Sequence, residues 1–450
     1  MEIHPEKRRT AEADIAAVLK ATGHLTELQA LNEFDFMERI YREVRKPSGG
    51  KFYLSAPANT SFLRLVDVIG EFLPSKDLVS DSEVFRTCKA VMGKLCEEGY
   101  RKLDVESFIS AVEEVIAATI HAHRFYTTLD GLDFVDFTEL RIGRLVIQRP
   151  DFAILQGSDA HPETRDHLWK RVDGALWLTE DITGSREECE RRFFESVRSV
   201  CGLLSLSFTM AAEWGVSGIR LSPCMDTRAR PSTSSWFSLT TDSNVLCVSS
   251  SWKGVQASSL NEIVANDLLD RDWFQNLTRI IQGNCQSDVA QALRRGIYWF
   301  FDAQLDTSLE MQMVKFWSCI ECIFSFLNVQ TTKSIRDGMT GMLILGGYKL
   351  VDVKDKTQLR KDIKRLYDLR CGAVHDAKHS HVTERDVATV SKWAAWVMIE
   401  VAGLAAAGVQ TRAEIKVQTD YWFDLLQEQN STAKAKENCP TCGNALQDLS

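Results

Sequence analysis

The sequence has no segment typical of a membrane-spanning or secreted protein. Among its 450 residues there is no uninterrupted apolar run of the roughly eighteen residues that a transmembrane helix requires. Residues 1–20 carry charges of both signs and contain no apolar core of the signal-peptide type. We therefore expect a cytoplasmic protein that makes no membrane contact.

Motifs of several common enzyme classes are also missing. The chain contains no Gly-x4-Gly-Lys-Ser/Thr, no HExxH and no GxSxG, so an ATPase, a zincin and an α/β-hydrolase are disfavoured. Positive charge is not in excess, because 53 Lys and Arg stand against 62 Asp and Glu, a formal net charge of −9. This balance argues against a surface that binds nucleic acid indiscriminately, although a nuclease needs only a local basic cleft.

Most of the twelve cysteines stand singly in apolar surroundings, which indicates buried free thiols in a protein without a secretion signal. The exception is Cys439-Pro-Thr-Cys442-Gly443, which looks like a zinc knuckle, a tight turn that presents two thiolates to one metal. Structural zinc takes four ligands. The other two would come from a second subunit or from Cys319 and Cys322, or the segment binds no metal. Any zinc here would be structural.

Length and periodicity predict a multidomain α+β protein. Residues 1–128 read as a helical N-terminal region and residues 129–257 as a mixed α/β module. Residues 258–410 read as an all-α bundle, and residues 411–450 as a tail that ends in the CPxCG segment. His121 and His123 fall at the end of the first region, where we expect helix, and residues two apart point to different sides of a helix. We therefore expect no metal at this pair.

One segment of the helical bundle, residues 309–327, is apolar on nearly all sides and predicts a core or interface helix. Glu321 lies in its middle. Because a buried carboxylate needs a partner, we expect Glu321 to make an ion pair.

Residues 358–377, QLRKDIKRLYDLRCGAVHDA, carry the pattern on which the functional hypothesis depends. Leu359, Ile363, Leu366 and Ala373 recur at helical spacing and predict one apolar face, and Arg370 falls on that same stripe. A guanidinium there is costly unless an acceptor or an anion meets it. His375 follows five residues later. A permanent cation beside a titratable imidazole suits phosphodiester chemistry, in which one holds the phosphate and the other moves protons.

The segment from Arg370 to His375 resembles the Arg-x4–6-His motif of HEPN domains, and the preceding Leu-Tyr-Asp-Leu resembles the Apea-like HEPN branch. The resemblance covers only the C-terminal helical region. Members of this superfamily are commonly metal-independent endoribonucleases of toxin, CRISPR and anti-phage systems, and they act as homodimers with a composite site. Many active members have a polar residue directly after the arginine, where this chain has Cys371.

The resemblance implies that His375 is a general acid or base and that Arg370 neutralises charge on the phosphate of an RNA substrate, in particular tRNA. Glu321 would hold the Arg370 guanidinium or lie beside the catalytic pair, or else it would only join two helices. The basic residues Lys361, Lys364 and Arg365 would contact RNA, unless they form a solvated helix face.

Two functions remain open at this point. The first is an endoribonuclease of a prokaryotic anti-phage or toxin-type system, in which the N-terminal region senses a phage-derived trigger or binds a regulatory partner. The second is a non-catalytic module for dimerisation or nucleotide binding. His379 and His381, on a polar loop after the motif, would either take part in RNA contact or be simply exposed, and we expect exposure.

Overall fold

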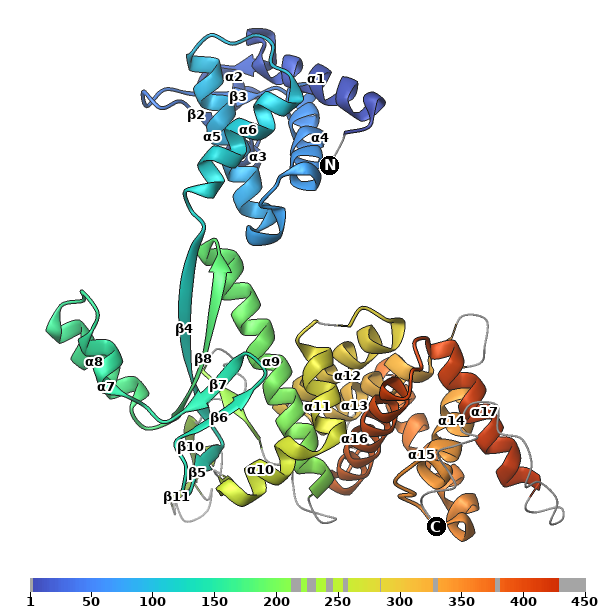
Figure 1. The fold of residues 1–450 in the computed structure, drawn as a ribbon. Coiled ribbons are helices and arrows are strands. Elements are labelled where there is room, and N and C mark those ends of the chain that lie inside the picture. The colour runs from blue at the N-terminus through green and yellow to red at the C-terminus, as the bar shows by residue number, and fades with distance from the viewer. Residues whose placement is uncertain are drawn as a thin grey trace. The chain divides into compact units, whose positions relative to one another are not determined.

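A computed structural model describes residues 3–211, 220–224, 232–239, 246–253, 258–283, 285–326, 331–376 and 381–428. The chain divides into two compact units, residues 1–125 with 181–193 and residues 126–180 with 194–450. Helices and strands occur in both units (Figure 1), so the mixed α+β class expected from the sequence is confirmed.

The first unit encloses an apolar core in which Phe62, Leu65 and Phe108 are fully buried. Its helices are α1 (Pro5–Leu19), α2 (Glu27–Glu33), α3 (Phe36–Arg42), α4 (Ala56–Phe72), α5 (Asp81–Glu97) and α6 (Val105–Ala117). An antiparallel sheet of order β1-β3-β2 joins them, built from β1 (His24–Leu25), β2 (Glu43–Arg45) and β3 (Lys51–Leu54). The sequence did not predict this sheet, because strands of two to four residues are too short to display alternation.

Strand β4 (His121–Asp130) corrects the interpretation of His121 and His123. These residues were expected in a helix, but Phe125, Tyr126 and the threonines that follow favour a strand. In a strand, residues two apart share a face, and the two imidazole centroids are 6.3 Å apart. Two imidazoles do not complete a metal site, and the described residues contain no group of three or more His, Cys, Asp or Glu that could hold a metal.

The middle of the chain forms strands where the sequence alternates. A five-stranded sheet of order β6-β7-β8-β4-β9 contains β6 (Glu139–Ile142), β7 (Leu145–Gln148), β8 (Leu176–Gly184) and β9 (Ser222–Pro223). Strand β5 (Leu132–Phe134) pairs in parallel with β12 (Ser258–Leu260), and β10 (Ser232–Leu239) pairs with β11 (Leu246–Lys253). Helices α7 (Phe152–Gln156) and α8 (Pro162–Val172), which the sequence did not predict, connect β7 to β8. Helix α9 (Arg186–Ala211) follows β8, as expected.

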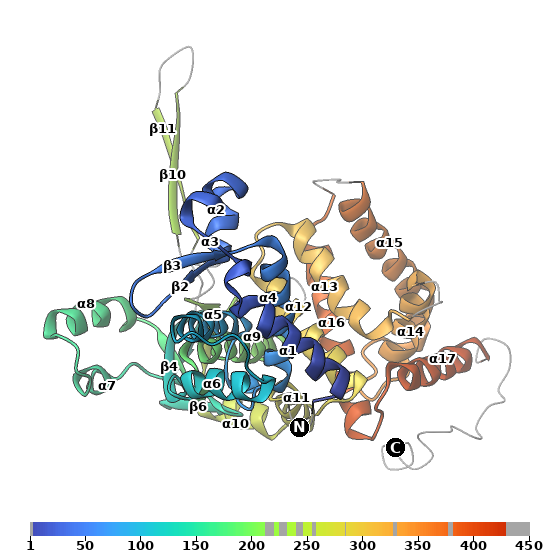
Figure 2. The ribbon, with the colours of Figure 1, turned by 90° about the horizontal axis from the view of Figure 1, so that it is seen from above.

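The C-terminal region is helical, as the sequence predicted. Helices α12 (Asp288–Leu305), α13 (Leu309–Phe324) and α16 (Glu384–Ala406) pack together, with α11 (Asp272–Ile281) against α12 and α16. Beside them, α14 (Thr331–Leu345) contacts both α15 (Lys356–His375) and α17 (Arg412–Glu428), as Figure 2 shows. Helix α10 (Glu262–Asp270) precedes this group. Because α17 packs on α14, the helical region continues beyond the expected boundary at residue 410.

Helix α16 is the one described helix whose length and composition would allow it to cross a membrane. Two-thirds of its most apolar stretch is buried inside the protein, and the buried residues of this helix include Trp393, Val397 and Met398. Its apolar composition is therefore accounted for by its position between α11, α12 and α13.

A glycine sets the distance between α9 and α12. A Cβ built on Gly202 would lie 2.8 Å from the carbonyl oxygen and 2.8 Å from Cγ2 of Ile297. The Ile297 carbonyl belongs to the α12 backbone and cannot move aside. The backbones of α9 and α12 can therefore approach this closely only because Gly202 has no side chain.

We expect Gly202→Ala to destabilise the protein by about 1–3 kcal/mol, because overpacking outweighs the gain in helix propensity. Gly403→Ala is the matched control, because a Cβ on this glycine of α16 meets no atom of the described chain within 4 Å. This control should raise stability by up to about 1 kcal/mol. Urea denaturation followed by circular dichroism measures both, and a stabilising effect of Gly202→Ala would contradict the close approach.

Candidate functional site

Helix α15 carries the residues predicted for the site. Leu359, Ile363 and Leu366 are buried, as expected, and this side of the helix packs against α13 and α14. Ala373, expected on the same buried face, is only half-buried and lines a surface pocket instead. The helix ends after His375, where the N–H of Asp376 donates to the carbonyl oxygen of Gly372.

Arg370 and Glu321 form the ion pair that the sequence led us to expect. The Arg370 Nη2 lies 2.9 Å from the Glu321 Oε2, and the two side chains are 16% and 18% exposed. The Tyr367 hydroxyl donates to the other carboxylate oxygen, Oε1, at 3.1 Å. Each oxygen of the Glu321 carboxylate therefore has a donor from α15, which joins α15 to α13 and fixes one side of the guanidinium.

Aromatic rings complete this cluster. The Trp317 and Tyr367 rings meet edge to face with centroids 5.2 Å apart, and the Arg370 guanidinium lies 5.7 Å from the Tyr367 centroid. Burial, and then the Glu321 charge, raise the pKa of Tyr367 to about 12. Tyr367 therefore keeps its proton and remains a hydrogen-bond donor throughout the physiological pH range.

Sequence reasoning assigned neither Tyr367 nor Trp317 of this cluster to the site. For Tyr367 a signal was present, because Tyr367 and Arg370 are three residues apart and so lie on one helix face. The Nε of Arg370 and the Nε1 of Trp317 are buried with no hydrogen-bond partner in the described part of the chain. The cluster thus retains donors beyond those that bind Glu321.

His375 is exposed and lies on another side of α15 from Arg370. Five residues of α-helix correspond to a rotation of about 500°, which leaves the two side chains about 140° apart around the axis. His375 shares its side of α15 with Asp368 and Gly372, seven and three residues before it. A single chain therefore does not direct the two motif side chains to the same point.

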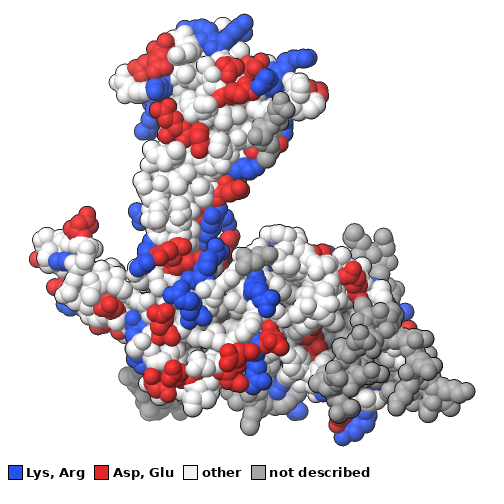
Figure 3. All heavy atoms as spheres, in the orientation of Figure 1, with Lys and Arg blue, Asp and Glu red and all other residues white. Residues whose placement is uncertain are grey.

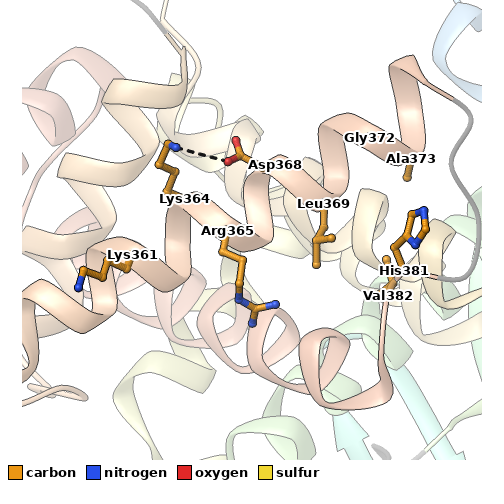
Figure 4. Close-up of a pocket in the computed structure, with 9 residues that line it drawn as sticks. All are labelled: Lys361, Lys364, Arg365, Asp368, Leu369, Gly372, Ala373, His381 and Val382. Atoms are coloured by element: carbon orange, nitrogen blue, oxygen red, sulfur yellow. Dashed lines mark ion pairs between the residues drawn. The ribbon is translucent and has the colours of Figure 1, made fainter.

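A pocket of about 680 Å³ follows that exposed side of α15 (Figure 4). Its lining contains the three basic residues predicted to contact RNA, and also Asp368, four apolar or small residues and His381; the full set is Lys361, Lys364, Arg365, Asp368, Leu369, Gly372, Ala373, His381 and Val382. His381 is exposed, as expected, and the fold also places it at this pocket, while His379 lies outside the described residues.

Carboxylates partly neutralise the basic residues. The Lys364 Nζ lies 3.7 Å from Asp368, and the Arg365 Nη2 lies 2.8 Å from Asp386 at the start of α16. Burial acts to raise the pKa of Asp386, but hydrogen bonds from Thr383 and the Arg365 charge outweigh it and lower this pKa. Arg365 therefore contacts the first turn of α16, which follows the segment that contains His381.

The described residues do not test the predicted zinc site. Cys439 and Cys442 lie outside the described residues. Burial raises the pKa of Cys322, and raises that of fully buried Cys319 well above its ordinary value. Both thiols thus lie in an apolar environment, and zinc binding at Cys439 and Cys442 stays a prediction.

Comparisons with protein-family models, with curated proteins and with solved structures found no match for this chain.

The buried and the exposed ion pairs of α15 should differ in strength. We expect Glu321→Gln to destabilise the protein by about 2–3 kcal/mol, since it leaves the half-buried Arg370 without a counter-charge. The control Asp368→Asn removes a carboxylate from the exposed Lys364 and should cost less than about 1 kcal/mol. Both changes keep side-chain volume, and urea denaturation compares them. Equal costs would show that the Glu321 pair contributes no more than a surface contact.

Proposed function

We propose that this protein is a metal-independent endoribonuclease of the HEPN type. The observation that carries the proposal is the motif helix α15, on which Arg370 is held by Glu321 while His375 remains exposed to a substrate. The sequence resemblance supplies the reaction class, and this geometry supplies one oriented cation and one accessible imidazole, the two groups that the reaction needs.

In the proposed reaction, the RNA 2′-hydroxyl attacks the adjacent phosphorus. The bond to the 2′ oxygen forms as the bond to the 5′ oxygen breaks, and the proton lost by the 2′-hydroxyl is balanced by one delivered to the 5′ oxygen. His375 acts as the general acid or base, and Arg370 neutralises charge on the phosphate oxygens. Glu321 and Tyr367 position the guanidinium. The products are a 2′,3′-cyclic phosphate and a 5′-hydroxyl, so only RNA is cleaved.

Two chains would complete one site. Because Arg370 and His375 lie on different sides of α15, a homodimer would let the arginine of one chain meet the histidine of the other. A two-fold axis makes such a contact reciprocal, so each chain supplies what its partner lacks. The exposed face drawn in Figure 3 mixes Lys and Arg with Asp and Glu, which favours a local RNA cleft over a broad basic surface.

The proposed biological setting is a cytoplasmic anti-phage or toxin-type system that cleaves tRNA or other host RNA. The first unit, with its separate core, would sense a phage-derived trigger or hold the nuclease inactive.

A non-catalytic dimerisation or nucleotide-binding module is the second candidate. The same ion pair favours it, since Glu321 already neutralises Arg370 and buries most of its guanidinium within one chain. An arginine used in this way stabilises a helix contact and leaves little free charge for a phosphate.

Purified protein incubated with total tRNA in EDTA tests the first candidate. Wild type should cleave and leave 2′,3′-cyclic phosphate ends, whereas His375→Ala and Arg370→Ala should each reduce the rate at least about 100-fold. His167→Ala, at an exposed histidine of α8, is the matched control and should retain full activity. Cleavage that persists in both site variants would exclude this site. A wild type that cleaves no RNA, even on induced expression in cells, would favour the non-catalytic module.

A mixture of the two inactive variants tests the composite site. If the arginine of one chain acts with the histidine of the other, Arg370→Ala chains and His375→Ala chains that are unfolded and refolded together should regain part of the wild-type rate. Each variant refolded alone should stay inactive. No recovery in the mixture, with mixed dimers verified by mass spectrometry, would place both residues of the working site in one chain.

A further inference from the structure

The α15 pocket has two chemically different ends. Lys361, Lys364 and Arg365 occupy the N-terminal part of its α15 wall. Toward the C-terminal part the lining changes to Leu369, Gly372 and Ala373, and across from the helix lie His381 and the buried Val382 (Figure 4). One end is thus cationic, and the other is an apolar surface with an imidazole beside it.

This combination fits a nucleotide better than a simple anion or an apolar ligand. The ammonium groups can meet phosphate oxygens, and an apolar surface beside an imidazole can receive the face of a base. The volume of about 680 Å³ is within the range of small-ligand sites. Of the lining residues, three are basic and one, Asp368, is acidic. With Asp386, which pairs with Arg365, these charged groups sum to +1, with Lys361 outside the two ion pairs, in a chain whose net charge is −9.

The pocket also lies on the side of α15 that leads to His375. The lining residues Lys361, Lys364, Asp368 and Gly372 succeed one another by three or four positions, and three more residues reach His375. A helix rises 1.5 Å per residue, so His375 lies about 4.5 Å along the axis beyond Gly372. A nucleotide in the pocket would therefore neighbour the phosphate on which His375 acts.

We propose that this pocket binds one nucleotide of the RNA strand next to the cleaved phosphate, a proposal that rests on the endoribonuclease function. The base lies on Leu369, Ala373 and Val382 beside His381, and Lys361 and Lys364 contact the strand's phosphates. The pocket would accordingly determine which nucleotide precedes or follows the cut.

The test fills the pocket without removing a charge. Ala373→Phe places a ring in the base position from a half-buried site, and Thr357→Phe, exposed on the same helix but outside the pocket lining, is the matched control. Fluorescence anisotropy measures binding of a labelled single-stranded RNA 12-mer to the full chain carrying His375→Ala, so that no cleavage interferes. A second assay sequences the cut sites in a randomised RNA treated with the two variants in the wild-type background.

We expect Ala373→Phe to weaken RNA binding about tenfold, the effect of losing one stacked base. It should also raise KM more than it lowers kcat and change the nucleotide preference at one position beside the cut. Thr357→Phe should alter none of these. Circular dichroism verifies that both variants are folded, and Ala373→Gln replaces Ala373→Phe if the ring prevents folding. Equal binding and equal preference for the two variants would overturn the proposal.

The outcomes separate this proposal from the endoribonuclease function itself. Normal cleavage with unchanged preference in Ala373→Phe would refute the pocket and leave the nuclease intact. Without cleavage, the anisotropy assay still decides: RNA binding lost only in Ala373→Phe supports the pocket, and no RNA binding by the chain refutes it. Displacement of the 12-mer by a free nucleoside monophosphate at equal concentration would show a site for a free nucleotide and overturn the RNA-strand assignment.

Discussion

The ion pair between Glu321 and Arg370 is the interaction on which the candidate site depends. Both groups are mostly removed from water, so each is tolerated only because the other is there. The pair also determines the orientation of α15 against α13, and the Tyr367 hydroxyl and the Trp317 ring reinforce it. Either function therefore requires this ion pair. A nuclease needs it to position the Arg370 guanidinium for a phosphate, and a non-catalytic module needs it to hold α15 against α13.

Two faces of α15 lie in different chemical environments. The side with Arg370 is enclosed by α13, where charge is balanced and aromatic rings exclude water. The side that leads to His375 is open and carries the pocket. Because His375 follows Arg370 by five positions, the two side chains lie about 140° apart around one helix, and the proposed composite site would bring them together from two chains. A dimer is thus part of the chemistry proposed here.

Several features of this arrangement follow from the sequence because they are local. The stripe of Leu359, Ile363 and Leu366 predicted the packed face, and an acidic residue inside an apolar helix predicted a partner for Glu321. Local reasoning was wrong for His121 and His123, where strand geometry replaced the expected helix and placed both imidazoles on one face. It also missed the short strands of the first unit, because strands of two to four residues are too short to display alternation.

By itself, the sequence determined where the C-terminal helices lie, which of their faces are apolar, and that a buried arginine and a buried glutamate need each other. These properties depend on residues within a few turns. Only the tertiary structure decided that Tyr367 shares the Glu321 carboxylate, that Asp386 engages Arg365, and that His381 joins the α15 pocket. Such contacts depend on how α13, α15 and α16 are placed in three dimensions, and that placement results from packing the whole core.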